Sequence, residues 1–281
     1  MRRVAIVFSL IFITTIVGLF YLPYTQDIIL GRLYQFTNIV YKVRKNITLA
    51  SVYMAFNSDK QYLAVTEGSR REEVASLCQE KLGWDNLEEQ SFAGTLSCSV
   101  LDNDEGYLMP GTYIVDKNSS PKDIKLEMTQ RFDHTLKQKV EELGGNSANI
   151  DTDTVITIAS IIQREAGGLN DMNIISGIIW NRLAIDMPLQ VDATLQYAKG
   201  KDGRWWPSVQ SKDKFLNSAY NTYQNIGLPP TPISNPGIDA ISAALNPEKT
   251  DCIFYLHDKY GRIHCSKTYP EHKKNVNKYL R

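Results

Sequence analysis

The most informative stretch of this 281-residue sequence is Thr154-Val-Ile-Thr-Ile-Ala-Ser-Ile-Ile-Gln-Arg-Glu165. Its apolar residues Ile158, Ile161 and Ile162 recur at the spacing of one helix face, and Glu165 takes the next place on the same stripe. The sequence therefore predicts an amphipathic helix that turns a carboxyl group toward the protein interior instead of toward water.

The position of Glu165 favours a role as a general acid. Burial among apolar residues raises the pKa of a carboxyl group, and the last turn of a helix disfavours an anion. A carboxyl that keeps its proton near neutral pH is what general-acid catalysis requires. The residues alone leave an alternative open, in which Glu165 pairs with Arg164 or Arg182 and only stabilises the fold.

Helices are predicted on both sides of this stretch. Asp153 is expected to cap the quoted helix, with Gly167-Gly168 at its end, and Asn170 to cap the next one. A long helix is expected to begin after Ser120, with Pro121 in its first turn. The apolar stripe of this long helix comprises Ile124, Met128, Phe132, Leu136, Val140 and Leu143.

Strands are predicted far from this helical stretch. Residues 62–66 read as a strand, followed by a helix with a capping box at Ser69 and Glu72 and a second strand over 92–101. Residues 252–267 are expected to form a hairpin, and a short helix follows it. Helices with separated strands predict the α+β class.

A long apolar run follows Arg2 and Arg3. Residues 4–22 carry no charge, and these nineteen residues as a helix would span about 28 Å, close to the roughly 30 Å hydrocarbon core of a bilayer. The positive-inside rule places residues 1–3 in the cytoplasm and the rest of the chain on the periplasmic, extracytoplasmic side. We expect an uncleaved single-pass anchor in the cytoplasmic (inner) membrane, because residues 21–24 offer no small-residue cleavage pattern.

Four cysteines are expected in an oxidising compartment on this topology. Cys252 and Cys265 flank the predicted hairpin, so a bridge between them is expected, and Cys78 with Cys98 would form a second one. The spacing leaves the pairing open, and buried free thiols explain the pattern equally well.

The net charge and the histidine spacing argue against two kinds of ligand, nucleic acid and metal ions. Lys+Arg and Asp+Glu both number 31, so the chain has no net charge that would gather nucleic acid, and we expect none to bind. The histidines show no metal-ligand spacing. We therefore predict no metal and no cofactor.

Two further acids and a group of aromatic residues are candidates beside Glu165. Glu105 lies in a loop rich in glycine, proline and aromatic residues, and Asp192 lies in a polar segment where a turn or cap is the alternative role. A second carboxylate near the first is what two-carboxylate glycosidases require. Trp205-Trp206 offers flat faces that suit sugar rings, although core packing is the commoner use of tryptophan.

Several short motifs follow one another along the chain. They are Glu105-Gly-Tyr-Leu-Met-Pro-Gly-Thr-Tyr113, Ala159-Ser-Ile-Ile-Gln-Arg-Glu165, Asn181-Arg-Leu183, Met187-Pro-Leu-Gln190 with Asp192, Tyr220-Asn-Thr-Tyr223, Gly227-Leu-Pro-Pro230, Asn235-Pro-Gly237 and Ser266-Lys-Thr-Tyr269. In this order they resemble the MltG (YceG-like) family of endolytic murein transglycosylases, from about Tyr62 to the C-terminus. Two positions depart from the family pattern, Gln163 in place of a frequent Glu and Gly111 in place of a frequent Asp.

The resemblance implies a function. The catalytic acid would be Glu165, and the substrate a peptidoglycan glycan strand cut between MurNAc and GlcNAc to leave 1,6-anhydro-MurNAc ends. Penicillin-binding peptidoglycan synthases would be partners whose nascent strands are terminated. The residues assigned to substrate binding are Gln190, Asp192, Tyr220, Asn221, Tyr223 and Glu105.

The expected architecture has five parts. They are a cytoplasmic tip (1–3), a transmembrane anchor (4–22), a membrane-proximal stalk (23–60), a LysM-like module (61–101) and a catalytic domain (102–281). Two other functions remain open on the sequence. One is a membrane-anchored hydrolase (muramidase) of the same bond, in which Asp192 or Glu105 assists water, and the other is a non-enzymatic wall-binding scaffold.

Overall fold

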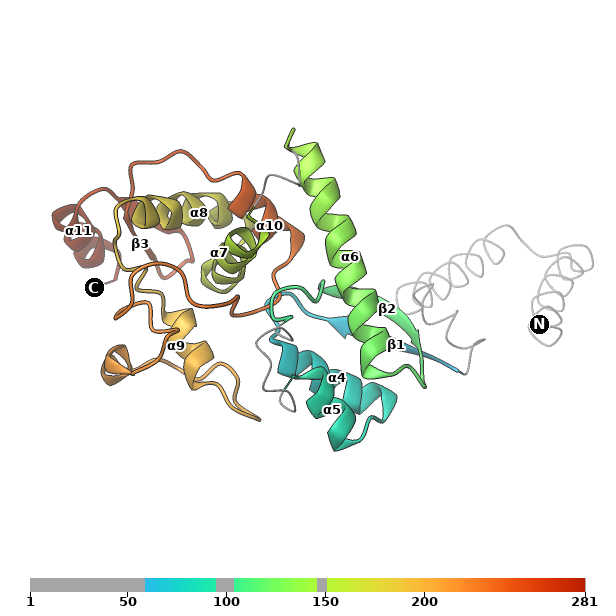
Figure 1. The fold of residues 1–281 in the computed structure, drawn as a ribbon. Coiled ribbons are helices and arrows are strands. Elements are labelled where there is room, and N and C mark those ends of the chain that lie inside the picture. Colours follow the sequence, from blue (N-terminus) through green and yellow to red (C-terminus); the bar gives the residue numbers. More distant parts are fainter. Residues whose placement is uncertain (1–58, 95–103, 146–150, 281) are drawn as a thin grey trace, which may run out of the picture. The chain divides into compact units, whose positions relative to one another are not determined.

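The computed structural model describes residues 59–94, 104–145 and 151–280, drawn in colour in Figure 1. The predicted anchor at 4–22 and nearly all of the predicted stalk lie outside these ranges. None of the helices within the described ranges has both the length and the apolar character needed to cross a bilayer. Asp59–Arg281 forms a compact unit of its own, in which helices predominate and the strands form two small sheets, and the predicted α+β class is confirmed.

The first sheet joins segments that are distant in the sequence. Strand β1 (Lys60–Val65) pairs antiparallel with β2 (Gly111–Asp116), and Leu63 lies opposite Tyr113. Helices α4 (Arg71–Leu82) and α5 (Asn86–Phe92) lie between these strands in the chain. The pairing joins the two segments that the sequence analysis assigned to separate modules.

Apolar side chains of these elements form what we call the small core. Alternate residues of each strand point into it, as the period of two in a pleated strand requires. Its fully buried members are Leu63, Val74, Ala75, Cys78, Phe92, Leu108, Ile124 and Met128.

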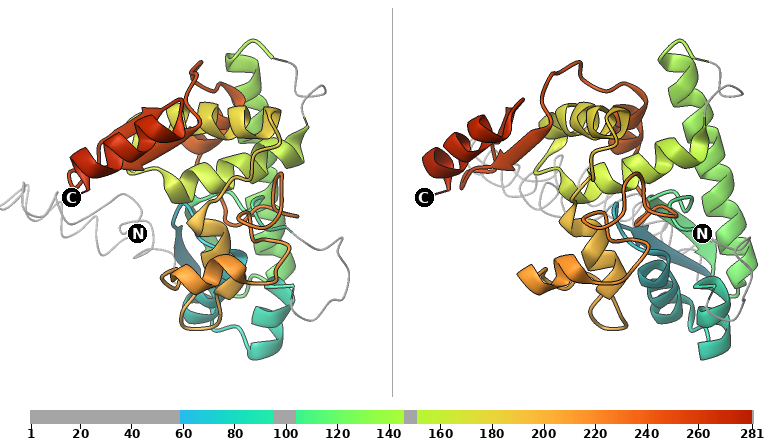
Figure 2. Two further views of the ribbon diagram at one scale, coloured as in Figure 1. Left: turned by 90° about the vertical axis from the view of Figure 1, so that its left-hand side faces the viewer. Right: turned by 60° about the vertical axis from the view of Figure 1, so that its left-hand side comes forward.

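Helix α6 (Pro121–Glu142) connects the small core with a second one. Ile124 and Met128 near its start pack in the small core, whereas Phe132 and Val140 pack in the other cluster. Figure 2 shows this green helix running beside both groups of elements. The predicted start at Ser120 is confirmed by a hydrogen bond from the Asp123 N–H to the Ser120 side chain.

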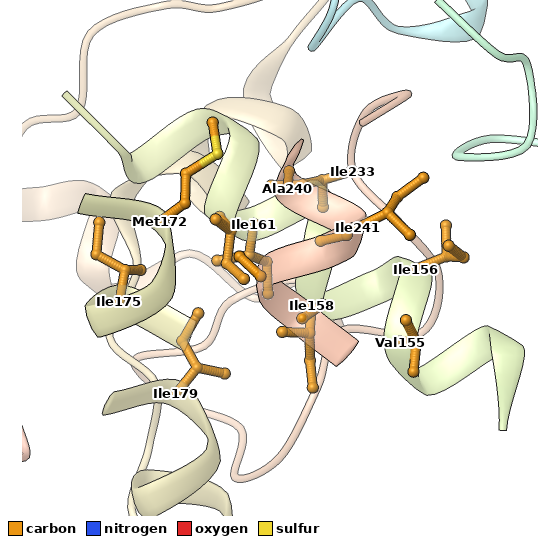
Figure 3. Packing of buried hydrophobic residues seen from close by; sticks show 14 of the residues in the cluster. Val155, Ile156, Ile158, Ile161, Met172, Ile175, Ile179, Ile233, Ala240 and Ile241 are labelled. Atoms are coloured by element: carbon orange, nitrogen blue, oxygen red, sulfur yellow. The ribbon is translucent and has the colours of Figure 1, made fainter. Parts of the chain in front are cut away.

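The second cluster, the large core, is built around α7 (Thr152–Glu165). Helices α8 (Leu169–Ala184) and α10 (Ile238–Leu245) pack against it. Figure 3 shows their isoleucines interdigitating. Its fully buried members include Ile156, Ile158, Ala159, Ile161, Ile162, Ile175, Ile233, Ala240 and Ile241. Burial of this apolar face of α7 against α8 and α10 holds the C-terminal end of α7 in a fixed place.

The C-terminal part is a hairpin followed by a helix, as predicted. Strands β3 (Phe254–His257) and β4 (Ile263–Ser266) pair antiparallel, and α11 (Tyr269–Tyr279) packs on both. The predicted Cys252–Cys265 disulfide is present. Between α8 and α10 the chain forms α9 (Asp192–Lys199) and a 3-10 helix, η3 (Ser211–Phe215).

Several predicted boundaries are wrong by one or two residues. Asp151, not Asp153, caps α7, because its side chain accepts the Thr154 N–H. Gly168, not Asn170, is the residue before α8. The capping box of α4 also lies one residue later than predicted, since the Arg70 N–H donates to Glu73.

Two larger corrections concern the small core and its neighbour. Phe92 ends helix α5 and does not begin a strand, residues 95–101 of the predicted strand lie outside the described residues, and β1 pairs with β2. Leu143 is 43% exposed, because α6 ends at Glu142 and the last residue of the expected stripe leaves the core. Within the described residues Cys78 is a buried free thiol, and its predicted bridge stays a prediction because Cys98 lies outside them.

Candidate active site

Glu165 is the last residue of α7, and its side chain is half-buried. The Tyr255 hydroxyl donates a hydrogen bond of 2.7 Å to its carboxyl group, and the backbone N–H of Ala193 donates another. Removal of water by the surrounding protein raises the pKa of Glu165, and these two donors oppose the rise without cancelling it. The group is therefore a carboxylic acid that resists ionisation yet keeps an accessible side.

Three elements from separate parts of the chain bring these atoms together. Glu165 comes from the end of α7, Tyr255 from β3, and Ala193 from the first turn of α9. The first turn of a helix presents unpaired N–H groups, which suit a carboxylate. Burial and the charge of Glu165 hold the pKa of Tyr255 well above its usual value, so its hydroxyl remains a donor.

The two arginines near Glu165 are engaged elsewhere. Within the described residues, neither Arg164 nor Arg182 forms an ion pair with Glu165. The Arg164 guanidinium lies 3.7 Å from the centre of the Trp206 ring, and Arg182 donates to the backbone carbonyls of Ile253 and Leu189. The alternative in which Glu165 is only half of an ion pair is therefore wrong for this structure.

Asp192 and Tyr223 lie beside Glu165. The Tyr223 hydroxyl donates a 2.7 Å hydrogen bond to Asp192, whose negative charge contributes to the raised pKa of Glu165. Gln190 is exposed and has a left-handed backbone with φ of 51°, and its N–H donates to the Thr222 carbonyl. The segments 190–192 and 222–223 thus lie together next to Glu165.

Glu105 and Asn221 occupy different surroundings from those expected. Both are fully buried, so neither reaches a bound glycan in this conformation. The Asn221 amide donates to the Lys214 and Leu216 carbonyls and shapes the loop before Tyr223. These two predicted substrate contacts are corrected to internal hydrogen-bonding roles.

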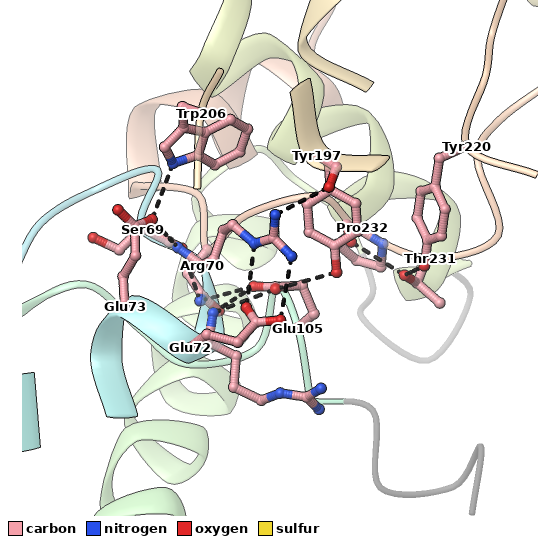
Figure 4. A network of polar contacts seen from close by, with 12 residues as sticks. Ser69, Arg70, Glu72, Glu73, Glu105, Tyr197, Trp206, Tyr220, Thr231 and Pro232 are labelled. Carbon is pink, nitrogen blue, oxygen red and sulfur yellow. Dashed lines mark hydrogen bonds and ion pairs between the residues drawn. The ribbon is translucent and has the colours of Figure 1, made fainter. Parts of the chain in front are cut away.

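Glu105 is the centre of the network in Figure 4. Its carboxyl accepts from the Arg71 N–H at 3.1 Å and from the Asn235 amide at 3.1 Å, and the Tyr197 hydroxyl lies 3.4 Å away. Burial raises the pKa of Glu105 to about 8, with the charge of Glu72 adding to the rise. The carboxyl connects the start of α4 with α9 instead of facing a substrate.

Tyr220 and the tryptophan pair border this network. The Tyr220 hydroxyl shares a 2.7 Å hydrogen bond with Thr231, and its half-buried ring lies 4.9 Å from the Tyr197 ring. The Trp206 indole N–H donates to Glu73 at 3.0 Å, and one face of its ring is covered by Arg164. Trp206 therefore follows the packing interpretation and not the sugar-stacking one.

Comparison with known proteins assigns the chain to a family. A family model described as the YceG-like family matches residues 26–278. The chain belongs to the YceG-like family. The resemblance inferred from the ordered motifs is thereby confirmed.

Relatives of this YceG-like chain carry descriptive names. A protein of Bacillus subtilis (strain 168) named endolytic murein transglycosylase is 34% identical over 221 residues, which are 76% of this chain and 59% of that protein. A protein of the same name from Streptococcus pneumoniae serotype 2 (strain D39 / NCTC 7466) is 31% identical over 179 residues, which are 63% of this chain and 32% of that protein. The chain thus spans less than two thirds of either curated relative.

A solved structure is also similar to this YceG-like chain. The crystal structure of a Listeria monocytogenes protein described as yceG-like has a TM-score of 0.66 and 32% identity. The match covers 76% of this chain and 75% of that one. The arrangement of helices and small sheets described above is therefore shared with a member of the family.

Sequence reasoning missed three parts of the YceG-like site. They are the Tyr255 hydroxyl, the Ala193 N–H, and a pair formed by His257 and Asp171, whose Nε2 and Oδ2 atoms lie 3.1 Å apart. The alternation of Tyr255 and His257 along the predicted hairpin was a signal that both face one side. Nothing in the sequence indicated that this side faces Glu165.

Glu165 has two hydrogen-bond donors that suit its ionised form, the Tyr255 hydroxyl and the Ala193 N–H. Across residues 59–94, 104–145 and 151–280, no group of three or more His, Cys, Asp or Glu side chains is placed to hold a metal ion. Glu165 can give a proton to a bound molecule from its accessible side. The donors then stabilise the carboxylate that remains, which allows the same group to act next as a base.

Proposed function

We propose that this chain is an endolytic murein transglycosylase that cuts peptidoglycan glycan strands with Glu165 as its only catalytic acid and base. The observation that carries the proposal is the half-buried Glu165 carboxyl, whose pKa is raised by desolvation while two hydrogen-bond donors stand ready for its ionised form. Family membership and the names of the two curated relatives support the same activity.

The proposed reaction begins with Glu165 as the acid. Its proton goes to the glycosidic oxygen as the bond from C1 of MurNAc to that oxygen breaks. The carbonyl oxygen of the substrate's own 2-acetamido group stabilises the positive charge at C1, so no second carboxylate is required.

Glu165 then acts as the base. Its carboxylate takes the proton of the C6 hydroxyl, and O6 forms a bond to C1 as the acetamido oxygen leaves. The product is a 1,6-anhydro ring, the carboxyl regains its proton, and no water is consumed. Tyr255 and the Ala193 N–H stabilise the carboxylate between the two steps.

The deciding experiment compares wild type with Glu165→Gln on purified polymeric glycan. We expect wild type to release fragments with 1,6-anhydro-MurNAc ends, detected by mass spectrometry. Glu165→Gln keeps the size of the side chain but has no proton to donate, so cleavage is expected to fall at least about a hundredfold. The melting curve of the variant should match that of wild type.

A hydrolase of the same bond is the second candidate function. Asp192 favours it, because this exposed carboxylate lies near enough to Glu165 to affect its pKa. A hydrolase leaves reducing ends only, so the end groups separate the two reactions. A wall-binding scaffold without activity would instead give the same result for wild type and Glu165→Gln.

The surroundings of the enzyme form the rest of the proposal. We propose that residues 4–22 anchor it in the cytoplasmic membrane and that the β1–α4–α5–β2 unit is the LysM-like part of the family. The catalytic unit would then act outside the cytoplasm. Nascent strands made by penicillin-binding synthases would be its substrates, and cleavage would end their elongation.

A further inference from the structure

One face of strand β3 is directed at Glu165. Tyr255 and His257 are alternate residues of this strand and so lie on the same face, with their rings edge-to-face at 6.0 Å. The Tyr255 hydroxyl donates to Glu165 at 2.7 Å. His257 is therefore the next side chain along the surface that contacts the acid.

Asp171 holds His257 from the opposite side. Its Oδ2 atom lies 3.1 Å from Nε2 of His257, and its side chain is almost completely buried. Asp171 belongs to the first turn of α8, where the helix dipole favours a carboxylate. The imidazole is thus fixed between the strand that carries Tyr255 and the helix that follows Glu165.

The backbone at Gly167 lies close to the Asp171–His257 pair. It lies two residues after Glu165, and a Cβ atom at this position would lie 3.1 Å from Oδ2 of Asp171 and 3.5 Å from Cδ2 of His257. It would also lie 3.4 Å from the Gly261 carbonyl oxygen. The link from α7 to α8 therefore passes directly over the Asp171–His257 pair.

Several charged or titratable groups face Glu165 from the elements around it. They are Arg164 of α7, Arg182 of α8, Asp192 of α9, Tyr223 of the loop between η3 and α10, and Tyr255 and His257 of β3. Both arginines make their contacts elsewhere, with Trp206 and with backbone carbonyls. His257 is the basic residue of this set that lies on the same strand face as Tyr255.

We propose that Asp171 and His257 form a positioning pair, which holds Tyr255 against Glu165 and stabilises the Glu165 carboxylate that forms between the two steps of the reaction. This inference rests on the proposed function. His257 transfers no proton in this scheme and does not touch the substrate. It acts through its charge and through the placement of Tyr255.

The direction of the effect follows from the charges. A positive imidazole attracts the carboxylate, and the charge of His257 accordingly lowers the pKa of Glu165 against the larger effect of burial. Without that charge, Glu165 would hold its proton to a higher pH. A less stable carboxylate makes Glu165 a weaker acid, so the first step, in which Glu165 gives up its proton, would slow.

The test is a titration of Glu165 in the full-length chain. The carboxyl carbons of glutamate are labelled with ¹³C, and the Glu165 signal is identified by its loss in Glu165→Gln. In His257→Gln the side chain keeps a polar contact with Asp171 but loses the charge. We expect the titration midpoint of Glu165 to rise by about 0.5 to 1 pH unit, and the alkaline limb of the pH profile of kcat/KM to move by the same amount.

The hairpin offers a matched control in His264. Its Nε2 atom lies 3.0 Å from Oδ2 of Asp258, so it is also a histidine paired with an aspartate, on the neighbouring strand. Its ring stacks on Tyr279, and its charge is not among the causes of the raised pKa of Glu165. His264→Gln is therefore expected to leave the Glu165 titration where it is in wild type.

Two further variants separate charge from packing. Asp171→Asn removes the partner charge, and Gly167→Ala pushes against the pair without altering any charge. Gly167→Ala is expected to shift the Glu165 titration through packing alone, whereas Asp171→Asn also removes a negative charge, which by itself lowers the pKa of Glu165 and opposes the shift expected in His257→Gln. A thermal melt of each variant confirms that the fold is retained.

The inference is overturned if His257→Gln titrates like wild type at Glu165 while the protein remains folded. This readout needs no turnover, so it does not depend on the proposed reaction. If wild type forms no anhydro ends, the proposed function fails instead. Anhydro ends that vanish in Glu165→Gln, combined with an unchanged titration in His257→Gln, reject the positioning pair alone.

Discussion

Glu105 and Glu165 both have a raised pKa because burial removes water from a carboxyl group. They differ in access, since the Glu165 side chain keeps part of its surface open and Glu105 has none. The same physical effect therefore produces a reachable acid at one position and an internal, pH-sensitive contact at the other.

Glu105 should make the stability of the fold depend on pH. Its pKa is about 8 in the folded protein against an ordinary value of 4.5, so between these pH values the folded state binds a proton that the unfolded state has lost. The free energy of unfolding must then fall as pH rises through this window, by about 1.4 kcal/mol for each pH unit crossed. Chemical unfolding of wild type at pH 5 and pH 8 measures this loss.

Glu105→Gln is expected to remove most of this dependence. The amide has nearly the shape of the carboxyl and can still accept from Arg71 and Asn235, but it does not titrate. Exposed Glu127 provides the matched control, because Glu127→Gln should lose as much stability as wild type between the two pH values. If Glu105→Gln also loses that amount, Glu105 is not the source.

Glu165 could be predicted from the sequence, whereas most of its partners could not. Its place on the apolar stripe of a helix is a local pattern that a single segment reveals. The contact with Tyr255 joins residues 90 positions apart, and only the folded chain creates it. Glu105 shows the opposite error, because it was assigned to substrate binding from a loop rich in glycine, proline and aromatic residues, and its side chain is fully buried.

The β3–β4 hairpin depends on its disulfide. Cys265 lies directly opposite Tyr255 in the strand register, so the bridge from Cys252 to Cys265 fixes the strand that delivers the tyrosine. Closing a loop over a sequence separation of 13 stabilises a fold by about 3 kcal/mol. Replacing both cysteines by alanine should lower the melting temperature and also the cleavage rate, because Tyr255 would be held less firmly.

Melting in reducing agent separates the effect of the Cys252–Cys265 bridge from the effect of replacing a cysteine side chain. Wild type should melt earlier in dithiothreitol, and the Cys252→Ala/Cys265→Ala double variant should not respond further. Cys78→Ala is the control, since Cys78 is a free thiol and its replacement should leave the response to reducing agent intact. An unchanged melting curve for reduced wild type would contradict the predicted role of the bridge.

The start of a helix was predicted correctly where the sequence offers one capping residue, and it was wrong by one or two residues where two capping residues lie close together. Ser120 followed by Pro121 marks the start of α6 without ambiguity, and the helix begins there. Asp151 and Asp153 are both good caps, and the sequence offers no reason to prefer the earlier one. Tertiary contact decides, because Asp153 accepts a hydrogen bond from Tyr107 and is thereby engaged elsewhere.

Asn235 joins three segments that are distant in the sequence. Its Oδ1 atom accepts from the N–H groups of Gly106 and Leu108, both at 2.9 Å. Its amide donates to the Ser69 carbonyl at 3.0 Å and to the Glu105 carboxyl at 3.1 Å. One side chain thus connects the start of α4, the segment before β2 and the segment before α10.

Asn235→Ala is expected to destabilise the whole protein. Two buried N–H groups would lose their acceptor, and each such loss costs about 1–3 kcal/mol. Exposed Asn225 is the matched control, because its amide also donates to two backbone carbonyls, but at the surface, and Asn225→Ala should cost less than about 1 kcal/mol. Equal losses in chemical unfolding would show that Asn235 is not a central junction.

For the whole chain, the sequence predicted the α+β fold class but not which strands pair. Both helix-rich and strand-rich segments were visible, which indicated α+β. The pairing of β1 with β2 was not visible, because their sequences show where a strand forms and not which partner it finds. The partner that β1 pairs with in the structure, residues 111–116, was not predicted.

Cys78 affects how the chain acquires its disulfide. In an unfolded chain under oxidising conditions its thiol, like that of Cys98, would compete with Cys252 and Cys265 for oxidation, and mismatched bridges would trap incomplete folds. Once α4 packs into the small core, burial raises the pKa of Cys78 to about 12 and removes its reactive thiolate form. Early closure of the small core thus protects oxidative maturation of the hairpin from this competitor.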